Sequence, residues 1–161
     1  MYELLAWLQG SALGQAMRGA GVWSYGVVNL THILGVATLF GALLILDLRL
    51  LGAWRRIPLA ALERPTVPLA VGGFIVAAAS GASMLTTNAT EYDGNPFLLI
   101  KFAAIGVGLL NVLAVRWVPA WSARHSDALS DRGRVELAAV GGISLASWIT
   151  AVAAGRMIGY W

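Results

Sequence analysis

The chain has 161 residues, of which 58% are apolar and only 12% charged, and its mean hydropathy is +0.73. Soluble domains are usually about 45–50% apolar and about 25% charged, so this composition excludes an ordinary water-soluble domain and indicates a protein surrounded by lipid. The absence of cysteine excludes disulfides and thiolate metal sites. The net charge of +3 does not indicate nucleic-acid binding, because the basic residues lie between apolar segments rather than in one patch.

Residues 1–22 are expected to form a short amphipathic helix that lies on the membrane surface. The alternative is a poorly ordered tail. A cleaved signal peptide is not expected, because the segment lacks a basic start and carries Glu3. The apolar face of the expected helix consists of Leu4, Leu5, Leu8, Ala12 and Ala16.

Residues 23–161 are predicted to form one transmembrane domain of four helices. A membrane-spanning helix needs about 20 apolar residues, and four segments of the chain meet that requirement. Asn95 followed by Pro96 is typical of a helix start, and Pro65, Pro68 and Pro119 are expected at the borders of spans. The predicted fold class is therefore an all-α bundle of four transmembrane helices preceded by an interfacial helix. The expected spans are residues 25–46, 66–87, 97–118 and 135–157.

Positive charge is distributed unevenly between the loops. Eight of the 11 Lys and Arg residues fall after the first and third spans, and loops rich in Lys and Arg usually face the cytoplasm. We therefore expect a multi-pass protein of a bacterial inner membrane with both termini on the periplasmic side. The eight residues are Arg49, Arg55, Arg56, Arg64, Arg116, Arg124, Arg132 and Arg134.

Several polar residues fall in the outer half of the expected spans or in the loop beside it. Ionisable groups at membrane depth are costly and are therefore candidates for a functional site. We hypothesise a pocket with His32 at its base and Lys101 and Arg156 at its rim, which suits an anionic ligand such as a haem propionate, a lipid phosphate or a carboxylate. The candidate ligand-binding residues are Asn29, His32, Tyr92, Lys101, Asn111, Arg156 and Tyr160.

Three of these residues, Lys101, Arg156 and His32, also have a simpler interpretation. Lys101 and Arg156 would then extend to the lipid headgroups. His32 would be a neutral imidazole that bonds to Asn29 or to a backbone carbonyl. Asp47 and Arg49 are interpreted as structural polar residues that pair at the inner end of the first span.

His32 is also a candidate metal or haem ligand, since imidazole is a common axial ligand of haem b. The second histidine, His125, falls in an inner loop and cannot bind the same iron across the bilayer. Met84 or a partner chain would have to supply the second ligand.

Four segments carry a resemblance that covers the chain from about Ser11 onward: THILG (31–35), DLRLLG (47–52), EYDGNPFLLIKF (91–102) and AGRMIGYW (154–161). With them the chain resembles a bacterial family of small four-span membrane proteins of unknown function. The resemblance implies the fold and topology but no activity. Relatives often carry histidine where this chain has Arg116. The positions that match the family pattern are His32, Asp47, Arg49, Tyr92, Lys101, Asn111, Arg156 and Tyr160.

The sequence contains no phosphate-binding glycine loop, nucleophile elbow or zinc-protease motif. It therefore favours a non-enzymatic protein, and our leading hypothesis is an accessory or anchoring subunit that works with partner chains or as a homo-oligomer. The first alternative is a haem- or metal-binding redox module that uses His32. A transporter of small molecules or ions is the weaker alternative, because the chain has no clear internal repeat.

Overall fold

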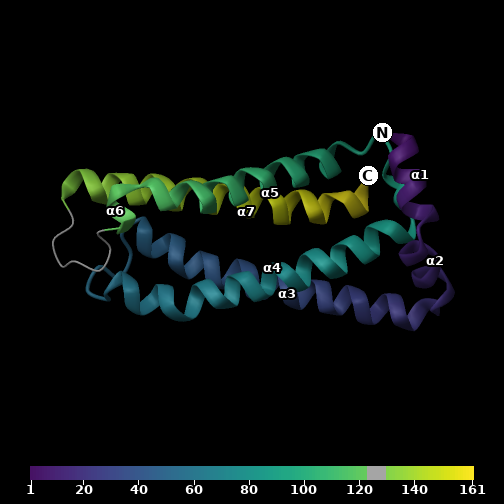
Figure 1. The fold of residues 1–161 in the computed structure, drawn as a ribbon, viewed down its shortest axis with the longest axis horizontal. Helices are drawn as coiled ribbons and strands as arrows, with labels where there is room; N and C mark the ends of the chain where they lie inside the picture. Colours follow the sequence, from purple (N-terminus) through teal and green to yellow (C-terminus); the bar gives the residue numbers. More distant parts are fainter. Residues whose placement is uncertain (123–129) are drawn as a thin grey trace.

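The computed structural model describes residues 1–122 and 130–161, and the described residues contain helices but no strands. Four long helices run side by side, and two short ones cross one end of them (Figure 1). Arg124 and His125 lie outside the described residues. The α-helices are α1 (Tyr2–Gly10), α2 (Ala12–Gly19), α3 (Gly21–Leu50), α4 (Leu59–Thr87), α5 (Pro96–Ala114), α6 (Pro119–Ser122) and α7 (Asp131–Met157). Short 3-10 helices are η1 (Ala89–Tyr92), η2 (Val115–Trp117) and η3 (Ile158–Tyr160).

The expectation of an all-α bundle with four membrane-spanning helices is confirmed. Each of the four long helices is long and apolar enough to cross a membrane. The 30 residues of α3 extend over about 45 Å, which matches a bilayer with its headgroups. Both termini lie at one end of the bundle (Figure 1). We call this the terminal end, and the opposite end, where α3 connects to α4, the loop end.

The start of the second long helix differs from the expectation. The second long helix begins at Leu59, so Pro65 and Pro68 lie inside it rather than before it. Transmembrane helices tolerate proline because neighbouring groups compensate for the missing hydrogen bonds. The expected cap at Asn95 is confirmed, because its side chain accepts a hydrogen bond from the Phe97 amide at 2.9 Å.

The four helices are arranged as two pairs. One pair is α3 with α4, the other is α5 with α7, and contact between α3 and α7 joins them. α4 and α5 scarcely touch. Glycine allows the first pair to pack closely, since a Cβ placed on Gly73 would lie 2.5 Å from the Leu39 nitrogen. Such backbone approach is a usual means of helix association in lipid.

An aromatic pair lies in the centre of the bundle. Trp148 of α7 is 5% exposed and packs edge-on against Phe74 of α4, with ring centroids 6.2 Å apart. Its indole also lies against Gly108 of α5, where a Cβ would come within 3.1 Å. Trp148 thus connects its own helix pair to the other one.

The single helix expected over residues 1–22 is two helices that lie across the terminal end (Figure 1). Ser11 separates them, because its side chain caps α2 by accepting from the Gly14 amide. The two helices are attached to the bundle: Leu5 is 4% exposed, and the Gln9 side chain accepts from Thr90 of η1 at 2.9 Å. The segment is therefore a structured cap on the bundle, and not a loose tail.

Exposed tryptophans mark both ends of the bundle. Trp7 and Trp23 are 70% and 90% exposed near the terminal end, and Trp117 is 79% exposed towards the loop end. Tryptophan is enriched at both membrane–water interfaces. Their positions agree with a bilayer that surrounds the bundle between them.

Candidate functional site

His32 lies where α3 faces α4. Its Nδ1 is 2.9 Å from the Ala77 carbonyl oxygen and 3.1 Å from the Ser80 hydroxyl. A carbonyl oxygen only accepts, so Nδ1 carries the hydrogen, and Nε2 of the neutral ring is left as an acceptor. A backbone carbonyl thus bonds to His32, as one of its two interpretations expects. The Asn29 side chain forms no hydrogen bond within the described part of the chain.

The position of the His32 ring depends on a glycine. A Cβ placed on Gly81 of α4 would lie 2.9 Å from the ring carbon Cε1. Any larger residue at position 81 would push against the imidazole. The local sequence of α4 therefore provides both the acceptor for Nδ1 and the space for the ring.

Lys101 approaches His32 from the other helix pair. It lies on α5, is half-buried, and packs its ammonium against α7, where a Cβ on Gly155 would be 3.6 Å from Nζ. It is close enough to His32 for its charge to act on the imidazole. Over residues 1–122 and 130–161, no hydrogen bond or ion pair engages this ammonium. No hydrogen bond joins the Lys101 and His32 side chains in the described part of the chain, so their shared pocket stays a prediction.

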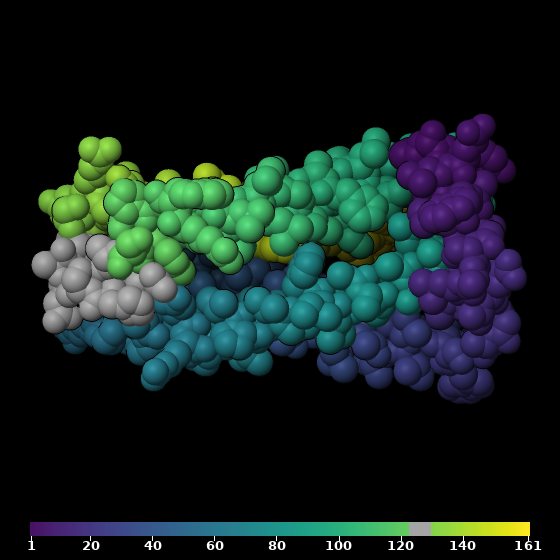
Figure 2. Space-filling view, in the orientation of Figure 1, coloured from purple at the N-terminus to yellow at the C-terminus, as the bar shows by residue number. Residues whose placement is uncertain are grey.

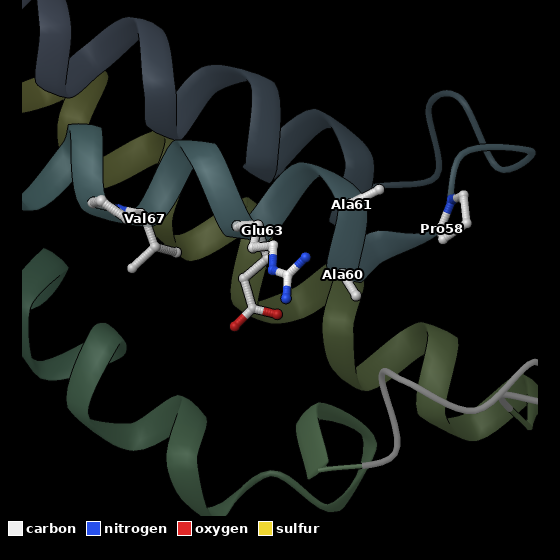
Figure 3. A pocket seen from close by; sticks show the side chains of 7 residues that line it. Pro58, Ala60, Ala61, Glu63 and Val67 are labelled. Atoms are coloured by element: carbon white, nitrogen blue, oxygen red, sulfur yellow. The ribbon is translucent and has the colours of Figure 1, made fainter.

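The two helix pairs leave a recess between α4 and α5. Figure 2 shows it on the face of the molecule, with atoms of α7 visible in its depth. At the loop end, the side of α4 that faces α5 and α6 borders a cavity of about 610 Å³ (Figure 3). Its lining includes Pro58, Glu63 and Val67.

Arg156 does not join His32 and Lys101. Its guanidinium lies over the ring of Tyr160, 4.6 Å from the centroid, and donates a hydrogen bond to the Tyr160 hydroxyl. Both residues are exposed and belong to the same end of the chain. The expectation that two cations lie above the imidazole is therefore wrong for Arg156, and Lys101 is the cation that remains a candidate.

Tyr92 belongs to a separate cavity of about 440 Å³ at the terminal end. Tyr25, Arg18 and Met84 also line it, and His32 does not. Burial, with smaller effects from Tyr25 and Glu91, raises the pKa of the Tyr92 phenol. Met84 thus faces another cavity and is not placed as a second haem ligand. No group of three or more potential metal ligands occurs among the described residues.

Asn111 has a structural contact. Its side-chain amide donates to the Val140 carbonyl oxygen of α7 at 3.0 Å. A polar bond of this kind holds two helices together in lipid. Asn111 therefore connects α5 and α7, and no contact of the described chain brings it to His32.

Asp47 and Arg49 do not pair, contrary to the expectation. Arg49 donates from Nε to the Ile57 carbonyl oxygen at 2.9 Å and so holds the loop after α3. Asp47 is 2% exposed and faces α7. Residues two positions apart on a helix point in different directions. This spacing was visible in the sequence and argues against the expected pair.

Comparison with known proteins adds no assignment: no protein-family model, curated protein or solved structure matches the chain. The resemblance to a family of small four-span membrane proteins therefore stays a prediction.

Proposed function

We propose that this integral membrane protein binds an anionic amphiphile, with a carboxylate or phosphate headgroup, in the recess between α4 and α5. Lys101 supplies the charge that pairs with the anionic oxygen. His32 Nε2 accepts a hydrogen bond from a hydroxyl of the same headgroup. The observation that carries the proposal is a Lys101 ammonium that has no hydrogen-bond or ion-pair partner among the described residues, together with a His32 imidazole whose Nδ1 is already bonded.

The energetic argument concerns the lysine. A charged side chain within a membrane-spanning helix costs about 2.5–3.5 kcal/mol on insertion scales when it lies near the bilayer centre, and less towards the surface. Lys101 lies about one turn inside α5, and its ammonium is against α7 instead of on the lipid-facing surface. A bound anion would offset this cost. The proposal thus gives the buried charge a partner that the described residues do not provide.

The recess suits a ligand that arrives from the membrane. Its walls are helices that are long and apolar enough to cross a bilayer, and it is open on the face that Figure 2 shows. A molecule with an acyl or isoprenoid tail would keep the tail in lipid while its headgroup reaches Lys101. A small water-soluble anion would lack this contribution from the tail.

The test is to identify anionic amphiphiles that co-purify with the protein from mild detergent, by native mass spectrometry. Lys101→Met should lose most of the bound ligand, and Lys101→Arg should keep it. Arg156→Gln serves as the matched control, because it removes a cation that, among the described residues, bonds to Tyr160 and not to Lys101 or His32. Equal retention by the wild type and Lys101→Met would refute the proposal.

The same sample tests the haem alternative. A Soret band in the visible spectrum that His32→Ala removes would assign haem b to the site in place of a lipid-like anion. Elemental analysis of the wild type and His32→Ala tests for a metal on His32, which the variant should lack.

An accessory subunit is our second candidate function. It is favoured by the poor contact between α4 and α5, which leaves an open flank along the bundle that a helix of a partner chain would fill. Chemical cross-linking in native membranes from a cysteine placed at Val71, which is 54% exposed, tests this candidate. A monodisperse, partner-free monomer that retains its ligand would argue against it.

We further propose that the loop end faces the cytoplasm of a bacterium and that both termini are periplasmic. Seven described arginines support this orientation, since they lie in or beside the connections at the loop end, as in cytoplasmic loops of known orientation. Because the chain has no cysteine, single cysteines at Arg56 and Trp161 can be labelled from either side without background. Labelling of position 56 from the periplasmic side would reverse the orientation.

A further inference from the structure

Asp47 is a buried carboxyl without a counter-charge. It is 2% exposed, and its Oδ2 atom has no hydrogen-bond partner. No ion pair engages it anywhere in the described part of the chain. The Ser144 hydroxyl of α7 donates a hydrogen bond to the carboxyl, which is the one interaction among the described residues that favours its charged form. An ionised carboxylate in such surroundings is strongly disfavoured, so the group is expected to take up a proton instead.

Close helix packing seals the carboxyl from water and lipid. Gly141 of α7 lies against the α3 backbone, and a Cβ on it would be 3.0 Å from the Asp47 carbonyl oxygen and 2.8 Å from Leu50 Cβ. Leu46 and Leu50, on either side of Asp47 in the chain, are both buried in the apolar cluster at the loop end. The side chain is therefore enclosed where α3 meets α7.

The charged groups around the loop end are engaged elsewhere or lie outside this contact. On its own helix, Arg49 donates to loop carbonyls. On α7, Arg132 pairs with Glu136 at 3.1 Å. The charged residues of α4 near this end, Glu63 and Arg64, line the cavity of Figure 3. On α5, Lys101 lies near the terminal end, and the polar residue nearer the loop end is Asn111, which is neutral and bonded to Val140.

A metal ion is a poor occupant for the same position. Oxygen-liganded cations require about six or more ligands, whereas here one carboxyl and one hydroxyl face each other. The described residues contain no group of three potential metal-binding side chains. A proton needs only the single carboxyl.

We infer that Asp47 is a proton-binding site that controls the contact between α3 and α7. Neutral Asp47 stabilises this contact, and ionised Asp47 weakens it. This contact joins the two helix pairs. Asp47 lies one turn from the end of α3, so a proton would reach it from the solution at the loop end whenever the contact opens. Its ionisation requires water to enter the contact, and the two pairs would then separate and widen the recess between α4 and α5.

Infrared spectroscopy of the protein in lipid tests the protonation. At neutral pH the wild type should show the carbonyl-stretch band of a protonated carboxyl, and Asp47→Asn should lack it. Labelling all aspartates with carbon-13 at the carboxyl should shift the same band in the wild type, so the assignment does not depend on folding of the variant. A wild-type spectrum without this band, or with a band that the label leaves in place, would overturn the inference.

Spin-label distances test the coupling to the helix pairs. Cysteines placed at Ala82 of α4 and Leu99 of α5, both exposed, carry the labels. The label-to-label distance should lengthen or broaden as the pH rises in the wild type and should stay constant in Asp47→Asn. A distance independent of pH in the wild type, or an equal change in both proteins, would show that Asp47 does not control the contact.

Discussion

Gly73 of α4 lies in backbone contact with α3, and the alanine substitution there is expected to separate the two helices. A Cβ at this position would lie 2.5 Å from the Leu39 nitrogen and 2.9 Å from the Gly35 carbonyl oxygen. Backbone atoms cannot turn aside as a side-chain end does, so the helices must move apart along their contact. Overpacking of this kind costs about 1–3 kcal/mol, and we expect Gly73→Ala to lose about 2 kcal/mol of stability.

Gly72 provides the control, because a Cβ there meets no atom within 4 Å. Gly72→Ala should be neutral or stabilising by up to about 1 kcal/mol, as alanine is the better helix former. Both variants would be unfolded reversibly in mixed micelles of a mild and a denaturing detergent, and their free energies of unfolding compared with the wild type. Equal stability of the two alanine variants would refute the close approach of α3 and α4 at Gly73.

Three further predictions concern other contacts. Arg18→Ala removes the hydrogen bond of 2.9 Å to the Thr87 carbonyl oxygen, and the loss of about 1–2 kcal/mol should speed amide hydrogen exchange in α2 roughly tenfold. Asn111→Leu removes the bond of 3.0 Å to Val140 and should cost about 0.6 kcal/mol in the same micelle assay. Burial raises the pKa of the Tyr92 phenol, so the folded protein favours the neutral phenol. The stability that the neutral phenol contributes should be lost as the pH rises above about 10. In the same micelle assay, Tyr92→Phe should therefore lose less stability at alkaline pH than the wild type.

The fold was predictable because hydropathy and helix caps act locally. Four apolar segments of sufficient length leave few alternatives in lipid, and the cap at Asn95 depends only on its own neighbours. The start of α4 was predicted wrongly, because Pro65 and Pro68 were expected to border the helix, whereas a transmembrane helix accommodates both. The division of residues 1–22 at Ser11 was missed, although a serine before a helical segment is a known start signal.

The site was predictable only in part, because one sequence does not fix how each helix is rotated in the bundle. Lys101 and Arg156 were both placed at the terminal end, but Lys101 packs against α7, while Arg156 interacts with Tyr160 on its own stretch of chain. The acceptor for His32 is a backbone carbonyl of another helix, and no side-chain pattern predicts that choice. The isolation of Asp47 likewise depends on Gly141 of α7, a contact that only the packed structure reveals.

The proposed ligand site and the proposed proton site both affect the contact between the two helix pairs. His32 belongs to the α3–α4 pair and Lys101 to the α5–α7 pair, so a ligand held by both would draw the pairs together. A neutral Asp47 favours the same arrangement, since it lets α3 and α7 close over it. Coupling between two such sites is reciprocal: if ionisation of Asp47 weakens ligand binding, a bound ligand must hold the proton on Asp47 by the same free energy. The two sites lie in opposite halves of the bundle, and the contact between α3 and α7 is the element that both would bias.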